Sequence, residues 1–192
     1  MRDGKYGILI ERKQEISQRQ ARVMTVHFKL VNTAEEIAEV ARIASEIWRE
    51  YYVSILTIEQ IEYMVDKFQS VPAITDQIHN QGYEYYLIQR AGSSTVGYLS
   101  VRPQEGKLFL SKFYILQEHR GQGYASQAVA FLEKLCKERS LTHIWLTVNR
   151  HNASSIAVYE KKGFRMVREQ VADIGNGYVM DDFVMEKEIA LP

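Results

Sequence analysis

The feature that most constrains the fold of this chain is a glycine-rich turn between an apolar segment and a helical pattern. Residues 108–116 form the apolar segment, which is typical of a buried strand, and the turn follows at residues 117–124. From residue 125 onward, apolar residues recur on one helical face. These residues are Ala125, Ala128, Val129, Leu132, Leu135 and Cys136. The stretch therefore predicts a strand, a tight turn and a helix, in that order.

Such a turn at the start of a helix is suited to binding phosphate. The first-turn N–H groups of a helix have no partner within the helix, and the helix dipole favours an anion there. Gly121 and Gly123 carry no Cβ, so an anion can approach their backbone closely, and Arg120 adds a positive charge. A Walker loop would require Gly-Lys-Ser/Thr, which is absent, and Ser126 stands where a dinucleotide fingerprint has its third glycine.

Two motifs together resemble those of the GNAT superfamily of acetyltransferases. Arg120, Gly123 and Ala125 fill the defining positions of its acetyl-CoA signature, Gln/Arg-x-x-Gly-x-Gly/Ala. Downstream, a predicted strand at residues 143–149 leads into residues 150–164, which are similar to the family's second cofactor segment, Asn-x-x-Ala/Ser-x-x-x-Tyr-x-x-x-Gly-Phe. The resemblance covers residues 24–191, and both motifs lie in the second half of that range.

The resemblance implies an α/β chain with the GNAT fold, in which a mixed, mostly antiparallel central sheet is flanked by helices. Two parallel strands, beginning near residues 108 and 143, are expected to splay apart at the cofactor site. The other expected strands are residues 25–31, 83–89, 95–102, 164–171 and 178–186, with turns at 91–94, 103–106 and 174–177. Thr33 with Glu36 forms a capping box for a first helix, Thr57 caps a second, and residues 73–79 suggest a third.

The apolar residues of the first two helices predict which faces are buried. The expected faces are Ile37, Val40, Ala41, Ala44, Ile47 and Trp48 in the first helix, and Ile58, Ile61, Val65 and Phe68 in the second. Cys136, the single cysteine, lies on the apolar face of the later helix. We interpret it as a packing residue rather than a nucleophile, because buried thiols behave as small hydrophobic groups.

The composition favours one globular domain. A chain of 192 residues, 46% of them apolar, can bury a full core. Its 24 basic and 24 acidic residues cancel, so no basic excess indicates a nucleic-acid partner. The sequence has neither a long apolar run nor a signal-peptide pattern, which leads us to expect a cytoplasmic protein without a membrane partner. Residues 24–192 form the expected domain, and residues 1–23 are an extension, either a tail or an arm used in a dimer.

The resemblance also implies which residues bind acetyl-CoA, the acetyl donor. The pyrophosphate would be bound largely by main-chain N–H groups of Arg120, Gly121, Gln122, Gly123, Tyr124, Ala125 and Ser126. Phe113 and Ile115 would offer backbone groups to the pantetheine arm, and the second motif would contribute Asn149, Asn152, Ser155 and Tyr159. Asn152 either caps a helix or contacts the cofactor. The five histidines show no metal-ligand spacing, so no metal is expected.

Tyr159 is the predicted catalytic residue. Its phenol has an ordinary pKa of about 10, so it is protonated at neutral pH and can donate a proton to the departing CoA thiolate. The alternative is an aromatic residue that packs a helix. No residue is indicated as the base by spacing. Glu50, Tyr51 and Tyr52 would lie near the acceptor cleft, and the charges of Asp181 and Asp182 could attract a cationic amine or simply lie at a strand edge.

The predicted function is transfer of an acetyl group from acetyl-CoA to a primary amine. Residues 173–185 are weakly similar to bacterial proteins grouped with polyamine acetyltransferases, which favours a small amine, possibly a polyamine. Two alternatives stay open: an enzyme that acetylates a protein N-terminus or lysine, and a catalytically silent acetyl-CoA-binding module. A homodimer is expected, because GNAT proteins of this size often dimerise and the C-terminal strands offer edges to be covered.

Overall fold

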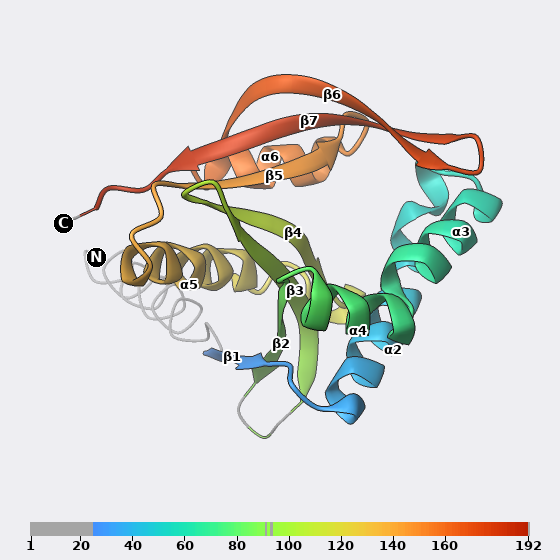
Figure 1. Ribbon diagram of the computed structural model, residues 1–192, viewed down its shortest axis with the longest axis horizontal. Helices are drawn as coiled ribbons and strands as arrows, with labels where there is room; N and C mark the ends of the chain where they lie inside the picture. The colour runs from blue at the N-terminus through green and yellow to red at the C-terminus, as the bar shows by residue number, and fades with distance from the viewer. Residues whose placement is uncertain (1–24, 91, 93, 192) are drawn as a thin grey trace, which may run out of the picture.

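A seven-stranded sheet forms the centre of the protein (Figure 1). The computed structural model describes residues 25–90, 92 and 94–191, so the predicted extension, residues 1–23, lies outside the described residues. The strands are β1 (Val26–Leu30), β2 (Glu84–Arg90), β3 (Thr95–Gln104), β4 (Lys107–Ile115), β5 (His143–Asn149), β6 (Arg165–Gly175) and β7 (Tyr178–Glu188), in the spatial order β1-β2-β3-β4-β5-β7-β6. Every neighbouring pair is antiparallel except β4–β5. The predicted mixed α/β fold is confirmed.

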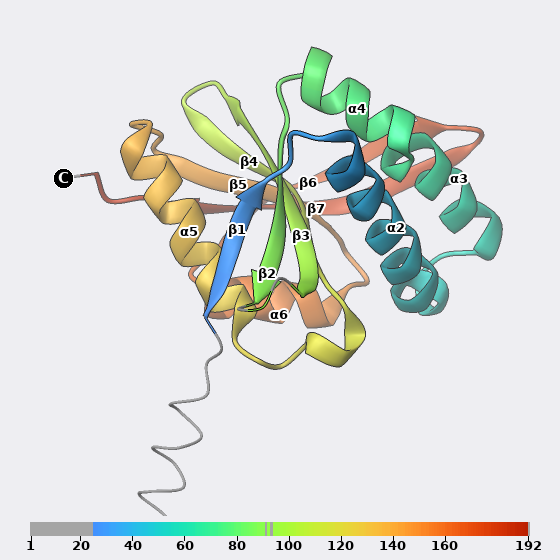
Figure 2. The same cartoon turned by 90° about the horizontal axis from the view of Figure 1, so that it is seen from below.

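Helices cover both faces of this sheet (Figure 2). On one side are α2 (Ala34–Tyr51), α3 (Ile58–Gln69) and α4 (Val71–Asn80), and on the other are α5 (Tyr124–Glu138) and α6 (Ala153–Lys161). There are also two short 3₁₀ helices. The first, η1 (Tyr52–Ser54), continues α2, and the second, η2 (Gln117–His119), forms the first part of the glycine-rich turn. The strand face toward α5 carries the largest apolar cluster, and α2 and α4 pack a second cluster against the other face.

Local hydrogen bonds explain where the first helices begin. The Thr33 hydroxyl accepts from the Glu36 N–H while the Glu36 carboxylate accepts from the Thr33 N–H, which confirms the predicted capping box. At the start of α3, the Thr57 hydroxyl accepts from the Gln60 N–H. Ser70 caps α4, and proline follows within the first turn, where its missing N–H costs nothing. This cap explains why α4 begins two residues before the predicted position.

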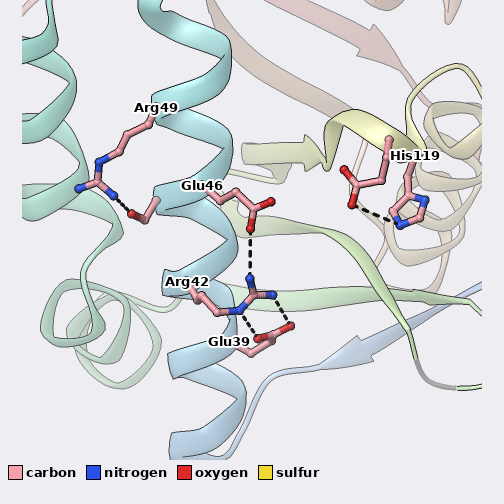
Figure 3. A network of polar contacts seen from close by, with 7 residues as sticks. Glu39, Arg42, Glu46, Arg49 and His119 are labelled. Carbon is pink, nitrogen blue, oxygen red and sulfur yellow. Dashed lines mark hydrogen bonds and ion pairs between the residues drawn. The ribbon is translucent and has the colours of Figure 1, made fainter.

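The solvent face of α2 carries ion pairs at helical spacing (Figure 3). Arg42 contacts Glu39 at 2.9 Å and Glu46 at 3.1 Å. Arg49 contacts Ser45 and, across to α3, Glu62 at 2.6 Å. Exposed pairs of this kind contribute roughly 0.2–1 kcal/mol each. The burial of the opposite face of α2 is therefore the main source of its stability.

Two turns are shorter than expected, and the strands that flank them are longer. The β3–β4 turn is only Glu105 and Gly106, with φ of 51° and 74°, so Pro103 and Gln104 belong to β3 rather than to a four-residue turn. The β6–β7 turn is likewise reduced to Asn176 and Gly177, with φ of 54° and 75°. Two-residue hairpins require positive φ at both positions, and these residue pairs allow longer strands than predicted.

The predicted buried faces are mostly right, with corrections at helix starts. Ile58 is wrong, because it is 67% exposed at the first position of α3, and Met64 is buried instead. In α2, Ile43 is buried and Ala41 only partly so. In α5, Tyr124 rather than Ala125 belongs to the buried face. Cys136 packs in the core as expected, and burial raises the pKa of its thiol to about 11.

The tip of the β6–β7 hairpin rests on α3, far from it in sequence (Figure 1). The Ile174 carbonyl accepts hydrogen bonds from the Tyr63 hydroxyl and from Lys67 Nζ, both at 2.6 Å. The Tyr63 ring also packs against Tyr178, with ring centroids 5.4 Å apart. The last two strands therefore reach across the sheet to the helical layer formed by α2–α4. Among the described residues, no helix is long and apolar enough to cross a membrane.

Candidate active site

A single cavity of about 1110 Å³ connects the glycine-rich turn with the space under the α2–α4 layer. One end is lined by the turn and the first residues of α5, and the other by residues of α3, α4 and the β6–β7 hairpin. Phe113 and Ile115 on β4, and Asn149, Asn152, Ser155 and Tyr159 in the second motif, also line it. The two predicted motifs are thus brought together around one cavity.

The splay between β4 and β5 opens the sheet at this cavity. The two strands are paired only at Leu108 with Ile144 and at Phe109 with Trp145. Beyond Phe109, the only described partner of β4 is β3, and the only described partner of β5 there is β7. The backbone edge at Phe113 is therefore available to a ligand, because an extended strand edge needs partners for its N–H and C=O groups, whereas the Ile115 carbonyl already accepts from Arg120 Nε at 3.0 Å. The predicted parallel, splayed pair is confirmed.

The start of α5 has the geometry of an anion site. Gly123 occupies the N-cap position with φ of 82°, and no side chain caps the helix. At Gly121, with φ of 74°, a Cβ would meet no atom within 4 Å, so a ligand has room beside the backbone. Gly121, Gly123, Ala125 and Ser126 line the cavity. Gln122 does not, because its side chain bonds the Glu118 carbonyl at 3.1 Å and accepts from the Tyr124 hydroxyl at 3.2 Å.

Arg120 is not the free positive charge that the sequence suggested. Its guanidinium donates to both carboxylate oxygens of Glu50, at 3.1 and 2.6 Å, and to the Ile115 carbonyl at 3.0 Å. The guanidinium also lies over the Tyr51 ring, 5.0 Å from its centroid. Arg120 thus joins the turn to β4 and to the end of α2, and Glu50 is an ion-pair partner rather than a free base.

Unpredicted cations lie on the opposite side of the turn. Lys161 and Lys162, at the end of α6, both line the cavity. Lys162 Nζ donates to the Ser126 hydroxyl at 2.6 Å and so lies beside the first turn of α5. The sequence could have indicated these cations, because Lys161 and Lys162 lie inside the second motif, directly before Gly163 and Phe164. Their positive charge is placed where the helix start already favours an anion.

Asn152 is a helix cap. Its Oδ1 accepts from the Ser155 N–H at 3.2 Å, so the capping role is present, and the residue also lines the cavity. The same oxygen accepts from the Tyr51 hydroxyl at 2.8 Å, and Tyr51 also bonds Ser154 at 2.7 Å. The start of α6 is thereby attached to the end of α2 across the cavity. Asn149 has a similar local role, because its Oδ1 accepts from the His151 N–H at 3.0 Å.

Tyr159 has a half-buried ring and an unpartnered hydroxyl. The ring packs edge-on against Phe164, with centroids 5.5 Å apart. Within the described part of the chain, no group hydrogen-bonds to the hydroxyl, and the residue lines the cavity. Burial raises the pKa of Tyr159 well above 10, and the neighbouring Tyr52 and Tyr51 raise it further. The phenol therefore keeps its proton throughout the physiological range, as a proton donor requires.

The sequence profile of the acetyltransferase (GNAT) family matches residues 37–164. The chain belongs to this family. It is therefore a GNAT N-acetyltransferase, and the recognised motifs lie within the matched range. A spermidine N(1)-acetyltransferase of Thermoplasma acidophilum is 24% identical over 157 residues, covering 80% of this chain and 92% of that protein.

Solved structures of GNAT enzymes share the fold. The PaiA N-acetyltransferase of T. acidophilum in complex with coenzyme A has a TM-score of 0.70 at 21% identity, covering 86% of this chain and 99% of that one. The ribosomal-protein-S18-alanine N-acetyltransferase of Escherichia coli has a TM-score of 0.62 at 15% identity, covering 88% and 96%. At these identities the two structures confirm the fold.

This GNAT enzyme also has a buried carboxylate in the cavity. Asp182, on β7 and directly opposite Asn149 on β5, is 6% exposed. Burial, the largest cause, and the charge of Asp181 together raise the pKa of Asp182 to about 6, against a hydrogen bond with Thr147 that lowers it. Asp181 has a different environment, because it forms an ion pair with Arg150 at 2.7 Å. The two adjacent aspartates could not be distinguished before the β5–β7 register was known.

A buried lysine lies at the far end of the same cavity. Lys112, on β4, is 8% exposed, and its Nζ donates to Gln77 Oε1 at 2.9 Å. Burial lowers the pKa of Lys112 to about 7. No carboxylate of the described residues forms an ion pair with it. Sequence reasoning missed Lys112, because a lysine between apolar residues of a strand is ordinarily placed on the solvent face.

Proposed function

We propose that this GNAT enzyme transfers the acetyl group of acetyl-CoA to a primary amine of a small molecule, with polyamines as the candidate class. The observation that carries the proposal is the continuity of the cavity. The cavity joins the uncapped start of α5, the open edge of β4 and the Tyr159 hydroxyl. It continues to the end lined by α3, α4 and the β6–β7 hairpin, which we call the acceptor end. A thioester donor and an amine can therefore meet beside Tyr159.

The residues present fit acetyl-CoA as donor. The N–H groups at the start of α5, with Lys161 and Lys162 beside them, suit a pyrophosphate. The edge of β4 that β5 leaves unpaired, at Phe113 and up to Ile115, suits the amides of the pantetheine arm, although the Ile115 carbonyl already accepts from Arg120. The donor supplies the acetyl group and the thiolate leaving group. Tyr159 supplies the proton that this thiolate takes as the carbon–sulfur bond breaks.

A small acceptor is favoured over a protein by the walls of the cavity. Lys67 and Ile174, whose contact joins α3 to the β6–β7 hairpin, both line the acceptor end. This contact narrows the space into which a polypeptide acceptor would extend beyond its reacting amine. The relative named as a spermidine acetyltransferase favours polyamines within this class. The alternative, a peptide acceptor, is suggested by the fold shared with the S18-alanine acetyltransferase.

An acceptor screen that follows CoA release tests the function. With acetyl-CoA as donor, we expect turnover of spermidine or another small amine to exceed that of peptides with a free N-terminus or lysine. Faster turnover of peptides would favour the alternative. A rise in melting temperature with acetyl-CoA but no turnover of any amine would indicate a silent binding module.

A variant of the helix start provides the control for this screen. Ala125→Glu places a negative charge at the proposed pyrophosphate site without the strain that a side chain at Gly123 would cause. We expect it to abolish both the acetyl-CoA-induced rise in melting temperature and CoA release. Ala130→Glu, at an exposed position of the same helix, should preserve both. If Ala125→Glu keeps the full shift while folded, the assignment of the donor site is wrong.

We also propose that the enzyme forms a homodimer through β6. Among the described strands this one pairs only with β7, so its other edge is open to them. Large apolar side chains are exposed along it, with Met166 at 53%, Val167 at 51% and Val171 at 66%. We expect light scattering to give the mass of a dimer, and Val171→Glu to give a monomer. Val71→Glu, at an exposed apolar position of α4, should remain dimeric. A monomeric wild-type protein would contradict the proposal.

A further inference from the structure

Asp182 is the buried carboxylate of the cavity whose hydrogen bonds are incomplete. It is 6% exposed, and its Oδ1 accepts no hydrogen bond from any described residue. A carboxylate oxygen that is removed from water without a donor is destabilising. Asp182 is nonetheless part of the cavity wall. A donor that arrives with a ligand would complete the hydrogen bonds of this carboxylate.

The position of Asp182 relates it to the reacting end of the cavity. Its charge raises the pKa of Tyr52, and Tyr52 in turn raises the pKa of Tyr159. Tyr52 therefore lies near both residues, and all three line the same cavity. The register of β5 and β7 places Asp182 beside Asn149, where the splayed edge of β5 ends.

We infer that Asp182 binds the ammonium group of the acceptor and takes its proton before the amine attacks the donor. This inference rests on the proposed function and adds the residue that receives the amine. An ammonium group offers three N–H donors to the unsatisfied Oδ1. Among the described residues, no lysine or arginine lowers the pKa of Asp182. A substrate cation would be its first cationic partner.

The reaction then balances in atoms and protons. The acceptor R–NH₃⁺ transfers one proton to Asp182 and becomes R–NH₂. The nitrogen lone pair forms a bond to the thioester carbonyl carbon, the carbon–sulfur bond breaks, and the sulfur takes a proton from Tyr159. The nitrogen loses its second proton, which restores the Tyr159 phenol through solvent. The proton on Asp182 is released to water, so one proton is liberated for each amide formed.

Asp182→Asn tests the inference, because it keeps the volume and removes the charge. We expect kcat/KM for spermidine to fall roughly 10²-fold, as for the loss of a general base. The spermidine-induced rise in melting temperature should also be lost, and this readout does not depend on turnover. Glu188→Gln neutralises an exposed carboxylate of the same strand and should change neither quantity.

The pH profile separates a functional carboxylate from a structural one. The ionised form of Asp182 is required, so wild-type kcat/KM should fall as the pH drops through about 6, and this limb should be absent in Asp182→Asn. The titratable groups that face Asp182 are Asp181 on its own strand and Tyr52 from η1. Asp181 is paired with Arg150, and burial raises the pKa of Tyr52 to about 12. Tyr52 therefore does not titrate near pH 6.

The melting temperature at two pH values provides a third test of Asp182. The pKa of Asp182 is raised in the folded state, so its carboxylate destabilises the protein at pH values above that pKa. Asp182→Asn should therefore melt at a higher temperature than the wild type at pH 8 and at a similar temperature near pH 4. Lower stability with loss of the acetyl-CoA-induced shift would identify a structural residue and overturn the inference.

Two further results keep the inference separate from the proposed function. Unchanged kcat/KM and an unchanged acid limb in Asp182→Asn would overturn the role of Asp182 while leaving the acetyltransferase assignment intact. A wild-type enzyme that turns over no amine would refute the proposed function, whereas the spermidine-induced melting shift would still test Asp182. If Asp182→Asn fails to fold, Asp182→Glu should retain the acid limb with reduced kcat/KM, and loss of that limb would count against the inference.

Discussion

Tyr159→Phe should slow the acetyl-transfer step by about 10²–10³-fold, the usual range for a single acid or base. The variant removes only the hydroxyl, which no described residue hydrogen-bonds, and keeps the ring that packs edge-on against Phe164. The fold should therefore be unaffected, because the packing volume is conserved. Acetyl-CoA affinity should also change little, since the proposed contacts lie at the α5 start and the β4 edge.

Single-turnover kinetics and a binding measurement together check this prediction. A slow transfer step with wild-type acetyl-CoA affinity would support proton donation by Tyr159. Loss of both would indicate a structural tyrosine, and full activity would leave the departing thiolate to be protonated by water. Tyr86→Phe is a suitable control, because it removes the hydroxyl of a buried tyrosine that bonds Glu84 and does not line the cavity.

Lys112→Met should stabilise the protein by about 1–4 kcal/mol near pH 6, as is found when buried charges are replaced by apolar groups of similar volume. The ammonium group is buried between the rings of Tyr83 and Tyr85, 5.5 and 5.2 Å from their centroids, and has no carboxylate partner in the described chain. Its acceptor, Gln77 Oε1, also accepts from the Tyr85 hydroxyl at 2.6 Å. No polar atom of Gln77 is therefore left without a partner by the substitution.

The gain should depend on pH in a defined direction. Burial lowers the pKa of Lys112 from 10.5 to about 7, so between these values the unfolded chain holds a proton that the folded chain lacks. The free energy of unfolding of the wild type therefore increases with pH across this range. The advantage of Lys112→Met should be largest at or below pH 7 and should shrink toward pH 10.

Urea denaturation of both proteins at pH 6 and pH 9 measures this difference. Lys107→Met, which removes a partly exposed lysine of the same strand and its 2.8 Å ion pair with Glu186, should change stability by roughly 1 kcal/mol or less. If Lys112→Met is instead less stable than the wild type at pH 6, the hydrogen bond to Gln77 outweighs the cost of burying the ammonium group.

The fold could be predicted because its determinants are local in sequence. The capping box at Thr33, the helical spacing in α5 and the glycines of the turn each act over a few residues. The errors are also local. Ile58 fits the apolar stripe of α3 but lies at its first turn, where the helix has not yet reached the core. Strand ends were predicted too short, since turn residues such as Gly106 and Gly177 compress each turn to two positions.

The candidate site was only half predictable, because its electrostatics depend on pairs that are distant in sequence. The motifs indicated which segments line the cavity, but they did not reveal that Glu50 would bind Arg120 across 70 positions. Asp182 could be distinguished from Asp181 only by the register of β5 and β7. The burial of Lys112 follows from the position of α4, whose Gln77 accepts a hydrogen bond from Lys112 Nζ. Charge pairing across the sheet has no signature in the spacing of residues.

The splay between β4 and β5 divides the sheet into two unequal sets of strands, and this division has a mechanical consequence. Two residue pairs of the ladder connect β1–β4 to β5–β7. The two halves share one apolar core, which includes Leu108 and Ile144, whereas the splayed ends of β4 and β5 border the cavity. The two sets of strands are therefore held together mainly by apolar packing, and few backbone hydrogen bonds connect them where the cavity lies. A thioester donor seated along the β4 edge would clamp the open side, so the acetyl group would be presented in a protein stiffer than the one that first bound it.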